Sequence, residues 1–593
     1  MCGIAGIVMR DGQRVESRWV DALATALEHR GPDGEGRHER VGVTLMQKRL
    51  AIIDLTGGDQ PLYGPDGEAG PVLVANGEIY NYRELRSSMD DVVFSTASDC
   101  EPPLHLYRRF GLDFVRHLRG MYAIAIDDPV KDHVVLARDP FGIKPLYYAL
   151  TDNGVVFASE MQAIVKTGLV AADLDPAKRD ELLQLQFTTG HRTAIAGIER
   201  VLPGEVLVIK DGQITDRHRH AALPEGDTRG LTENDALRLL DEYLAESVDL
   251  HQRADVDYGM FLSGGIDSSA ILAMMARLNV RPVHAFTIGF DGTEVHDERA
   301  LARRAAASVG AEHEEISFTE RDFWSLLPKV AACMDDPVAD YAILPTYKLA
   351  QCAREAGIKV ILSGEGGDEL FGGYGRYRRA ARWRIFGGRP MRQSGVFDGL
   401  GILRNHPAEW RAGIANSEQS ASRPTRTRLQ TVQAIDIDDW LPNDLLGKLD
   451  RCLMAHGIEG RVPFIDPVVA DFAFKLPDRL KTSRRLGKVL LRKWLEQNLP
   501  VSEPFKPKMG FTVPVGEWIA SKREALGPLV ARQESIQQIC NPDAVERLLK
   551  ACANGAAKQE KQAAWVLLYY ALWHRRHVQG IVPEGDVLSE LAA

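Results

Sequence analysis

The chain has few cysteines, no long hydrophobic run and no strong excess of charge of either sign. Its seven cysteines are scattered over 593 residues and never spaced as CxxC, which argues against a disulfide framework and a zinc site. No apolar run reaches the ~18 residues that a membrane-spanning helix needs, and the densest one, 563–573, suits a buried helix. The formal charge of −10 creates no field that would gather polyanions. We therefore expect neither a membrane protein nor a partner of nucleic acid.

The N-terminus lacks the basic and apolar regions of an export signal, so we expect the protein in the cytoplasm. A length of 593 residues exceeds what one hydrophobic core usually supports, which predicts more than one domain. The oligomeric state does not follow from the sequence, and a homodimer is left open.

Two kinds of pattern divide the chain. Short apolar runs bounded by turn residues favour a sheet-rich, α+β first domain, and the polar stretch 212–232 favours a linker. We therefore place the domains at 1–225 and 226–593. In the second domain, apolar strands alternate with amphipathic helices, which predicts an α/β, doubly wound parallel sheet with a helical C-terminal part from about residue 438. The strands are expected at 258–262, 283–290, 313–318 and 358–362.

Cys2 is a candidate nucleophile because of its position. A small second residue allows removal of Met1, which would leave a thiol and a free α-amine on one residue. An α-amine with a pKa of about 7.7–8.0 can accept the thiol proton near neutral pH. A cysteine at position 2 is, taken alone, more often a core residue, so the assignment depends on the motifs that accompany it.

Five segments accompany Cys2 in the first 101 residues: MCGIAG at 1–6, His29–Asp33, Arg49–Asp54, Asn76–Asn81 and Ser98–Glu101. In this order they resemble the class II glutamine amidotransferase domain. The resemblance implies an αββα sandwich of the N-terminal-nucleophile type, which hydrolyses glutamine through a thioester on Cys2. It also implies an oxyanion hole formed by the Asn76 side chain and the Gly77 N–H.

The same resemblance implies a site for the zwitterionic substrate. It assigns the planar guanidinium of Arg49 to the glutamine α-carboxylate and Asp99 to the α-ammonium. The full set implied to bind glutamine is Arg49, Leu50, Ile53, Asn76, Gly77, Glu78 and Asp99. Pro102 and Pro103 depart from the family pattern, but proline is tolerated in a first helical turn, so a helix start at Glu101 is still expected.

A glycine-rich loop, 263–269 (SGGIDSS), joins a strand pattern to an apolar helix. Glycines let the backbone approach a phosphate, and the helix N-terminus directs N–H groups at it. Asp267 is then a candidate magnesium ligand. The loop is neither a Walker A motif nor a GxGxxG motif, and a glycine turn without a ligand is the alternative.

SGGxDS resembles the ATP-pyrophosphatase signature, and 362–374 (LSGEGGDELFGGY) resembles the second ATP-site segment of asparagine synthetases. This resemblance implies ATP and Mg²⁺, with Asp267 and Asp368 on the metal. It assigns Glu365 to the formation and breakdown of an acyl-adenylate. The residues implied around ATP are Leu262, Ser263, Gly264, Gly265, Asp267, Ser268, Ser269, Ile288, Ser363 and Gly364.

Further matches lie toward the C-terminus. Glu459–Asp466 resembles a family segment in which Gly460 replaces the usual valine, and Lys488 and Arg492 match the family pattern KxxxR. We assign to Lys488 the stabilisation of phosphate charge during adenylation. The alternative is that Lys488 and Arg492 are only a solvated pair on one helix face. Segment 506–514 also resembles longer bacterial relatives, and the arginine-rich run 376–392 is expected to be a solvated face with one or two phosphate contacts.

The resemblance to glutamine-hydrolysing asparagine synthetases extends from Cys2 to about residue 576. It implies that glutamine, aspartate and ATP are the small-molecule substrates, and that ammonia passes between two sites. Segments 335–340 and 457–461 are expected to border the acceptor pocket, which Gly457 and Gly460 would enlarge. Two alternatives remain open: a different carboxylate acceptor, from a peptide or a saccharide precursor, and a non-catalytic scaffold or sensor with the same fold.

Overall fold

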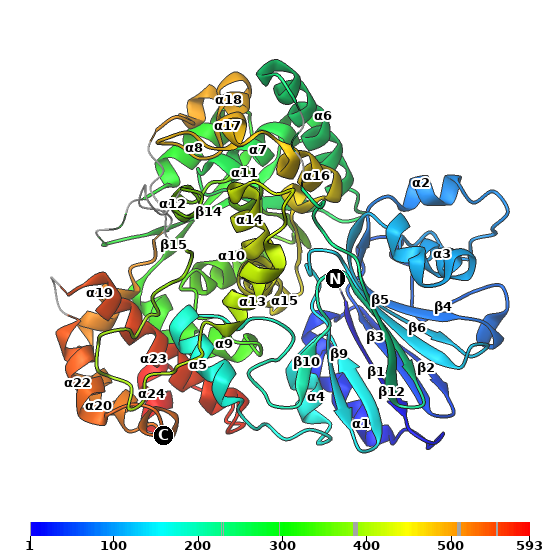
Figure 1. Ribbon diagram of the computed structural model, residues 1–593, viewed down its shortest axis with the longest axis horizontal. Coiled ribbons are helices and arrows are strands. Elements are labelled where there is room, and N and C mark those ends of the chain that lie inside the picture. The colour runs from blue at the N-terminus through cyan, green and yellow to red at the C-terminus, as the bar shows by residue number, and fades with distance from the viewer. Residues whose placement is uncertain are drawn as a thin grey trace.

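A two-sheet sandwich occupies the N-terminal part of the chain, and a parallel sheet covered by helices follows it (Figure 1). This computed structural model describes residues 2–226, 228, 230–293, 295, 297–382, 390–506, 512–552 and 556–593. The N-terminus lies at the junction between the two parts, so the candidate nucleophile is close to the second one (Figure 1).

The sandwich consists of two six-stranded antiparallel sheets. The first has the order β10-β8-β9-β1-β3-β2, with β1 Gly3–Met9, β2 Gly34–Arg40, β3 Val43–Arg49, β8 Tyr147–Thr151, β9 Gly154–Ala158 and β10 Ile198–Arg200. The second has the order β12-β11-β7-β6-β5-β4, with β4 Leu62–Tyr63, β5 Val72–Ile79, β6 Gly120–Asp128, β7 His133–Arg138, β11 Glu205–Lys210 and β12 Gln213–Arg219.

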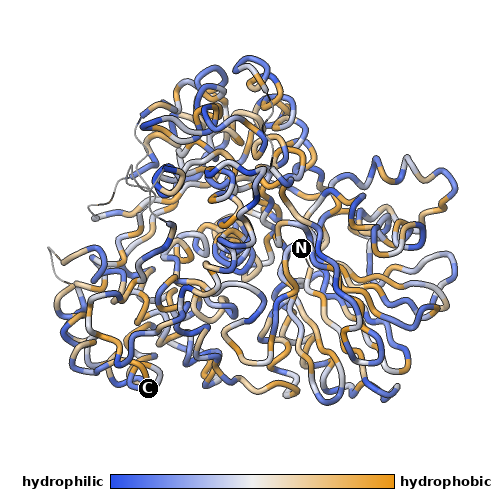
Figure 2. Tube along the Cα trace, viewed as in Figure 1, coloured by the Kyte–Doolittle hydropathy of each residue, from blue (hydrophilic) through white to orange (hydrophobic). Residues whose placement is uncertain are grey.

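Side chains alternate along the strands between the space that separates the two sheets and the outer faces of the sandwich. Ile4, Val74 and Ala125 point between the sheets and are fully buried in the inner core. Figure 2 shows orange, hydrophobic stretches along the strands of the sandwich. The opposite faces are covered by α1 (Ser17–Ala26) and α4 (Met161–Lys166) on the first sheet and by α2 (Tyr82–Ser87) and α3 (Pro102–Phe110) on the second. The predicted αββα layers are confirmed.

The second sheet system is parallel and has the order β15-β14-β13-β16-β17. Its strands are β13 Tyr258–Phe261, β14 His284–Phe290, β15 Glu312–Phe318, β16 Val360–Leu362 and β17 Glu459–Arg461. The direction of winding reverses between β13 and β16, and ligands bind beyond the carboxyl ends of the strands at such a point. The prediction of a doubly wound sheet is confirmed. β17, which lies in the part expected to be mostly helical, was not predicted.

Helices surround this sheet and extend it toward the C-terminus. Those that position the residues discussed below are α6 Glu233–His251, α7 Ile266–Leu278, α9 Glu320–Cys333, α10 Ile343–Glu355, α11 Gly367–Phe371, α15 Gly447–Met454, α18 Val489–Asn498 and α23 Lys558–His577. A π-helical segment, Asp436–Leu446, leads directly into α15. The apolar run 563–573 is buried in α23, as expected. In the part of the chain that the structure describes, no helix meets the length and apolarity needed to cross a bilayer.

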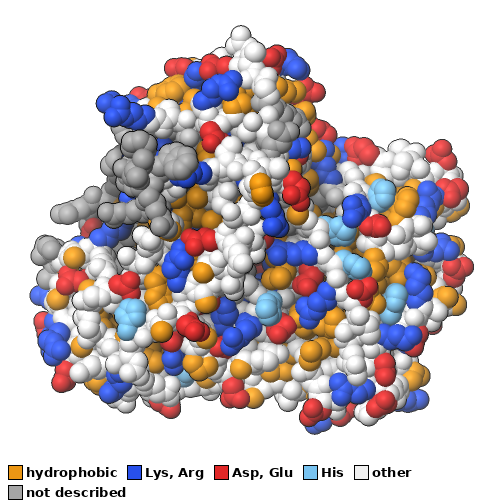
Figure 3. All heavy atoms as spheres, in the orientation of Figure 1, with side chains coloured by type: hydrophobic (Ala, Val, Ile, Leu, Met, Phe, Trp, Pro, Cys, Tyr) orange, Lys and Arg blue, Asp and Glu red, His pale blue; other side chains and the backbone are white. Residues whose placement is uncertain are grey.

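Charged side chains are distributed differently at the surface and at the junction of the two parts. On the face shown in Figure 3, acidic and basic side chains are interspersed. At the junction, by contrast, buried pairs such as Arg30–Asp450 and Arg461–Glu78 cross from the sandwich to the second sheet system. Buried charges of this kind need well-placed partners, so they define how the two parts fit together.

Candidate active sites

Cys2 lies at the start of β1, buried beside the neighbouring strand β5 of the second sheet. Its backbone nitrogen donates to Asn76 Oδ1 at 3.0 Å, and its Sγ is 4.0 Å from the Leu50 carbonyl oxygen. Burial raises the pKa of the Cys2 thiol, which makes a nearby proton acceptor necessary for a thiolate to form. Removal of Met1, which lies outside the described residues, would turn the Cys2 nitrogen into such an acceptor.

Asn76 and Gly77 lie side by side on β5. Asn76 is fully buried, and no described residue accepts a hydrogen bond from its Nδ2. A Cβ on Gly77 would lie 2.1 Å from the Met121 carbonyl oxygen, so only glycine allows the approach of β6 at this point. A buried amide donor without a partner, close to a candidate nucleophile, is the arrangement that an oxyanion requires.

The predicted glutamine-binding residues lie in three environments. Asp99 is buried, accepts a hydrogen bond from the Ile79 N–H at 2.8 Å, and has its pKa raised to about 6 by burial. The Arg49 guanidinium donates to Asp59 Oδ1 at 2.8 Å and to the Ile53 carbonyl oxygen at 3.3 Å. Glu78, in contrast, is paired with Arg461 of the second part at 3.2 Å, so its carboxylate belongs to the junction.

The glycine-rich loop and the SGEGGDE segment follow the adjacent parallel strands β13 and β16, whose registers pair Met260 with Leu362. The two loops touch: a Cβ on Gly364 would lie 2.9 Å from Asp267 Cβ, and one on Gly367 would lie 2.4 Å from Asp267 Oδ1. The structure therefore brings the two predicted ATP segments together at the point where the sheet reverses its winding.

The serines of the loop shape the start of α7. Ser268 Oγ lies 3.1 Å from Ser263 Oγ and accepts from the Ser263 N–H at 3.2 Å, while Gly265 forms the N-cap. Gly264 has a φ of +69°, a conformation that favours glycine. Leu262 and Ile288 are buried at the ends of β13 and β14, and Ser269 is buried in α7. All of these predicted residues thus surround one loop.

Lys488 joins the two loops. Its ammonium contacts Asp267 and lies 2.7 Å from Asp368 Oδ1, while the side chain is 1% exposed. Burial lowers the pKa of Lys488, but the two carboxylates outweigh it, so the pKa is raised and the side chain stays charged. Lys488 has a φ of +56° and caps α18, so it does not form the solvated helix pair with Arg492 that was the alternative. Arg492 instead donates to the Gly487 carbonyl oxygen at 2.8 Å.

The pair Asp267 and Asp368 fits a magnesium ion that also binds phosphates. Mg²⁺ is usually held in proteins by one or two carboxylates together with water and substrate phosphates. Within the described ranges no group of three or more metal-binding side chains occurs, so a dedicated protein cage is not present there. A Cβ on Gly373 would lie 1.7 Å from Asp368 Oδ1. Any other residue at position 373 would therefore clash with this carboxylate.

Glu365 is close enough to Asp267 and Asp368 to be affected by their charges, and it also lies near a lysine that we did not single out in the sequence. Lys448 Nζ on α15 is 3.9 Å from Glu365 Oε1 and 3.0 Å from Asp340 Oδ2. Burial raises the pKa of Glu365, Lys448 lowers it, and the nearby charges of Asp340 and Asp368 raise it further. Glu369, in α11, is buried and has its pKa raised to about 8 by burial and by Asp368.

Some expectations about the acceptor pocket are wrong. Asp336 pairs with Arg200 and accepts from Tyr147 of the sandwich, so it belongs to the junction. Gly460 packs against Leu449 and Leu453, each 3.1 Å from a Cβ placed there, and therefore does not enlarge a pocket. Of the remaining motifs, 383–389 in the arginine-rich run and 507–511 in the 506–514 segment lie outside the described residues.

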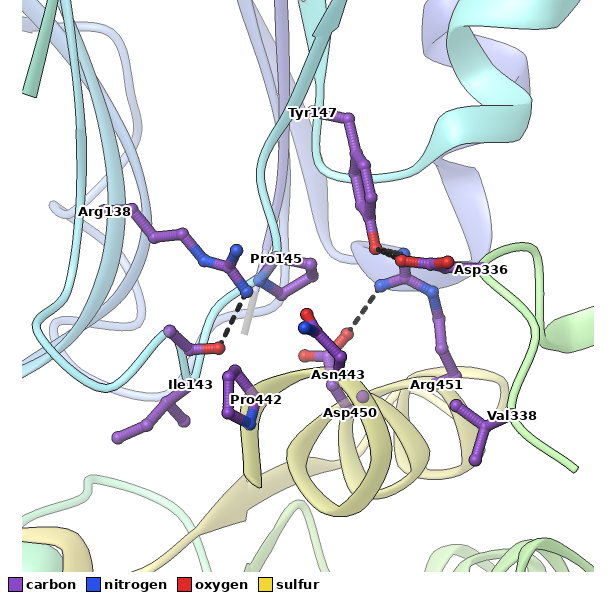
Figure 4. A pocket seen from close by; sticks show the side chains of 12 residues that line it. Arg138, Ile143, Pro145, Tyr147, Asp336, Val338, Pro442, Asn443, Asp450 and Arg451 are labelled. Carbon is purple, nitrogen blue, oxygen red and sulfur yellow. Dashed lines mark hydrogen bonds and ion pairs between the residues drawn. The ribbon is translucent and has the colours of Figure 1, made fainter. Parts of the chain in front are cut away.

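A cavity lies at the junction, between the sandwich and α15 (Figure 4). Its charged lining residues are already paired with protein atoms: Arg138 donates to the Lys144 carbonyl oxygen at 2.7 Å, and Arg451 donates to Asp335 at 2.6 Å and to Asp450 at 3.1 Å. Figure 4 shows Tyr147 and Asp336 meeting above Arg451. The cavity thus belongs to the junction, and its lining includes none of the predicted catalytic residues of either site.

Two family models match the chain. The one described as a glutamine amidotransferase domain matches residues 1–220, and the one described as asparagine synthase matches residues 239–575. The chain belongs to the asparagine synthase family.

Members of the family from two bacteria match over most of their length. The chain is 32% identical to asparagine synthetase [glutamine-hydrolyzing] 1 of Bacillus subtilis, over 98% of this chain and 97% of that protein. It is 30% identical to asparagine synthetase B of Escherichia coli, over 91% of this chain and 86% of that protein. A protein of Gibberella zeae named amidase chry2 is 27% identical over 89% of each chain.

Proposed function

We propose that the protein is a glutamine-dependent asparagine synthetase. It would hydrolyse glutamine to glutamate and ammonia, activate aspartate with MgATP as β-aspartyl-AMP, and release asparagine, AMP and pyrophosphate. The observation that supports the proposal is the presence of two arrangements in one chain: Cys2 beside an unpaired Asn76 donor, and Lys488 in contact with Asp267 and Asp368 at the winding reversal of a parallel sheet.

Glutamine hydrolysis would take place at the start of β1. The Cys2 α-amine accepts the thiol proton, and the sulfur attacks the side-chain amide of glutamine, whose developing oxyanion is stabilised by Asn76 Nδ2 and the Gly77 N–H. Ammonia leaves with the proton returned by the amine, and water then hydrolyses the thioester to glutamate. Arg49 and Asp99 would hold the α-carboxylate and α-ammonium of the substrate.

Aspartate activation would take place at the two glycine-containing loops. An aspartate side-chain oxygen attacks the α-phosphorus of ATP, and pyrophosphate leaves while Lys488 and the N–H groups of the loop stabilise its charge. Mg²⁺ bound to Asp267 and Asp368 would neutralise phosphate charge. Ammonia then attacks the activated carbonyl, AMP leaves, and Glu365 accepts the proton that the ammonia nitrogen loses.

The organisation of the chain follows from this proposal. We assign glutamine hydrolysis to residues 1–225 and aspartate activation to 226–593, and we place the enzyme in the cytoplasm with small molecules as its substrates. A homodimer remains a prediction. Ammonia is mostly protonated at neutral pH and then cannot attack a carbonyl, so the buried charge pairs at the junction suit a passage shielded from solvent.

The direct test incubates the purified full chain with MgATP, glutamine and aspartate, and measures asparagine, glutamate, AMP and pyrophosphate. We expect asparagine and pyrophosphate to rise together, and only when aspartate is present. A Cys2→Ala variant should lose glutamine-dependent synthesis and keep synthesis from added ammonium. Glutamate release without aspartate-dependent pyrophosphate would contradict the proposal and indicate a different carboxylate acceptor. If glutamine hydrolysis did not depend on Cys2, the alternative of a non-catalytic scaffold or sensor with the same fold would be favoured.

A further inference from the structure

Lys448 is a buried ammonium with unused hydrogen-bonding capacity. It lies on α15 with its side chain 6% exposed, and among the described residues it makes one hydrogen bond, to Asp340 Oδ2 at 3.0 Å. An ammonium carries three N–H donors, and leaving a buried donor unpaired is unfavourable. The Glu365 carboxylate, at 3.9 Å, is too distant to accept one of them. Two donors therefore remain for a ligand.

Asp444 provides a second, independent indication at the same place. It precedes Lys448 by one helical turn, is 5% exposed, and accepts from the Trp440 indole N–H at 2.5 Å through Oδ2. Its Oδ1 is buried and has no donor among the residues that the structure describes. Burial and the charge of Asp340 raise the pKa of Asp444 to about 7. A cationic group bound there would favour the ionised form.

The backbone around Asp340 and Asp444 has features that are typical of a ligand-binding site. Asp444 lies near the end of the π-helical segment Asp436–Leu446, a rare conformation that is frequent at functional sites. Asp340 precedes α10, where its Oδ1 accepts from the Ala342 N–H at 3.0 Å, which fixes the carboxylate. One cation and two carboxylates from separate elements are thereby held together.

These groups lie close to Glu365, which belongs to the same SGEGGDE segment as Asp368. Lys448 contacts Glu365 from α15, whereas Asp267 and Asp368 both contact Lys488. The charges of Lys448, Asp340, Asp368 and Asp267 all act on Glu365, so the residues around Lys448 and the two carboxylates proposed to hold Mg²⁺ are neighbours of one residue. A small amino acid bound at Lys448 would therefore lie beside Glu365, where the proton of ammonia is proposed to be accepted.

We propose that Lys448 binds the α-carboxylate of the acceptor amino acid and that Asp340 and Asp444 bind its α-ammonium. This inference rests on the proposed function and specifies its acceptor as a free α-amino acid with a short acidic side chain. The three residues act as positioning groups for the side-chain carboxylate. A peptide or saccharide precursor would lack one or both of the charges that they match, so the arrangement selects against those acceptors.

The test compares acceptors that differ in one charge. Pyrophosphate release is measured with MgATP and ammonium as nitrogen donor, which bypasses glutamine hydrolysis, for aspartate and for isoasparagine, whose α-carboxylate is an amide. Lys448→Gln should raise the KM for aspartate about tenfold to hundredfold, the range for a hydrogen bond to a charged group, with little change in the KM for ATP. The preference of the wild type for aspartate over isoasparagine should fall by a similar factor.

Three further variants make the result specific. Lys448→Arg keeps the charge and should restore part of the selectivity, and Asp444→Asn should weaken the preference for aspartate over succinate, which lacks the ammonium. Lys493→Gln removes a lysine on α18 that pairs with Glu233 at the surface and is the matched control. Glutamine hydrolysis by each variant reports that the chain is folded.

The outcomes separate this inference from the proposed function. If the wild type releases no pyrophosphate with aspartate, the proposed function fails. If it does, and Lys448→Gln keeps both the aspartate KM and the selectivity, the inference alone is overturned. A variant that changes kcat and its pH profile with an unchanged aspartate KM also overturns it, because Lys448 would then act through Glu365. If Lys448→Gln does not fold, the selectivities of Lys448→Arg and Asp444→Asn decide the question.

Discussion

The ionised carboxylate of Asp99 is unfavourable because the side chain is buried. The residue is buried, its Oδ2 accepts from the Ile79 N–H, and burial raises its pKa from 3.8 to about 6. A carboxyl group with a raised pKa stabilises the fold in its protonated form, so this stabilisation is complete below about pH 4 and is lost as the pH rises to about 6. At pH 8 the loss corresponds to about 3 kcal/mol. Perturbed pKa values are frequent at functional sites, and the raised pKa of Asp99 agrees with its proposed contact with the α-ammonium of glutamine.

An Asp99→Asn substitution should therefore stabilise the free protein. The amide oxygen can still accept from the Ile79 N–H, and the amide does not titrate. We expect the melting temperature at pH 8 to rise by several degrees above that of the wild type, with the difference shrinking as the pH falls from 6 to 4, while glutamine hydrolysis declines. Scanning calorimetry at several pH values measures this. Equal melting temperatures of the two proteins at pH 8 would contradict it.

Candidate residues could be selected from the sequence when their neighbours in sequence formed a motif. Cys2, Asp267 and Glu365 stand in such short motifs, and their roles stay predictions. Lys448 stands in an ordinary amphipathic segment, and its hydrogen-bond partner Asp340 comes from a distant part of the chain, so its proposed role depends on a tertiary contact. A lysine four residues after an aspartate on a buried helix face was the one local signal available, and such pairs are common on solvated helices.

At the scale of elements, α15 connects the two parts of the molecule. Lys448 at its start faces Glu365, whereas Asp450 and Arg451 on the same helix pair with the sandwich and the junction. The Asp450 carboxylate receives two N–H donors from Arg30, at 2.8 and 3.2 Å, and both side chains are almost fully buried. A shift of α15 would therefore disturb the interface and the proposed acceptor site together.

Removing Asp450 should be costly because it leaves Arg30 buried with one fewer counter-charge. We expect Asp450→Ala to lower the free energy of unfolding by about 3–5 kcal/mol, the range for breaking a buried ion pair. Asp438→Ala is the matched control, since Asp438 also pairs across the two parts, with Arg219, but both side chains are about 40% exposed. It should cost no more than about 1 kcal/mol. Urea unfolding of the three proteins measures the difference, and similar losses for both variants would refute it.

The short strand β17 shows why some elements escaped prediction. Its three residues, Glu459–Arg461, are polar or small, and they form a strand because β16 offers an edge beside them. Arg461 then reaches Glu459 and Glu78, so its charge is balanced by contacts distant in sequence. Long apolar strands such as β6 could be predicted from their run of hydrophobic residues alone, without knowledge of the neighbouring strand.

At the scale of the whole molecule, the alternation of strands and helices predicted the parallel sheet, and the family resemblance implied the αββα layers, but neither predicted how the two parts join. Hydrophobic periodicity records which face of an element is buried, and it does not record which element covers that face. The junction is formed by buried charged side chains, among them Arg30, Glu78 and Asp450, and the sequence pattern cannot distinguish these from surface charges. The boundary near residue 225 remains a prediction.

The junction predicts that the two half-reactions are joined within one chain. Cys2→Ala should use only added ammonium, and Lys488→Ala should hydrolyse glutamine without making asparagine. An equimolar mixture of the two variants contains both activities, but its ammonia must cross the solvent, where at neutral pH most of it is protonated. We expect the mixture, at pH 7 and low protein concentration, to release much more glutamate per asparagine than the wild type does. Parallel assays of the two products decide this, and a mixture that equals the wild type would mean that ammonia exchanges freely with the solvent.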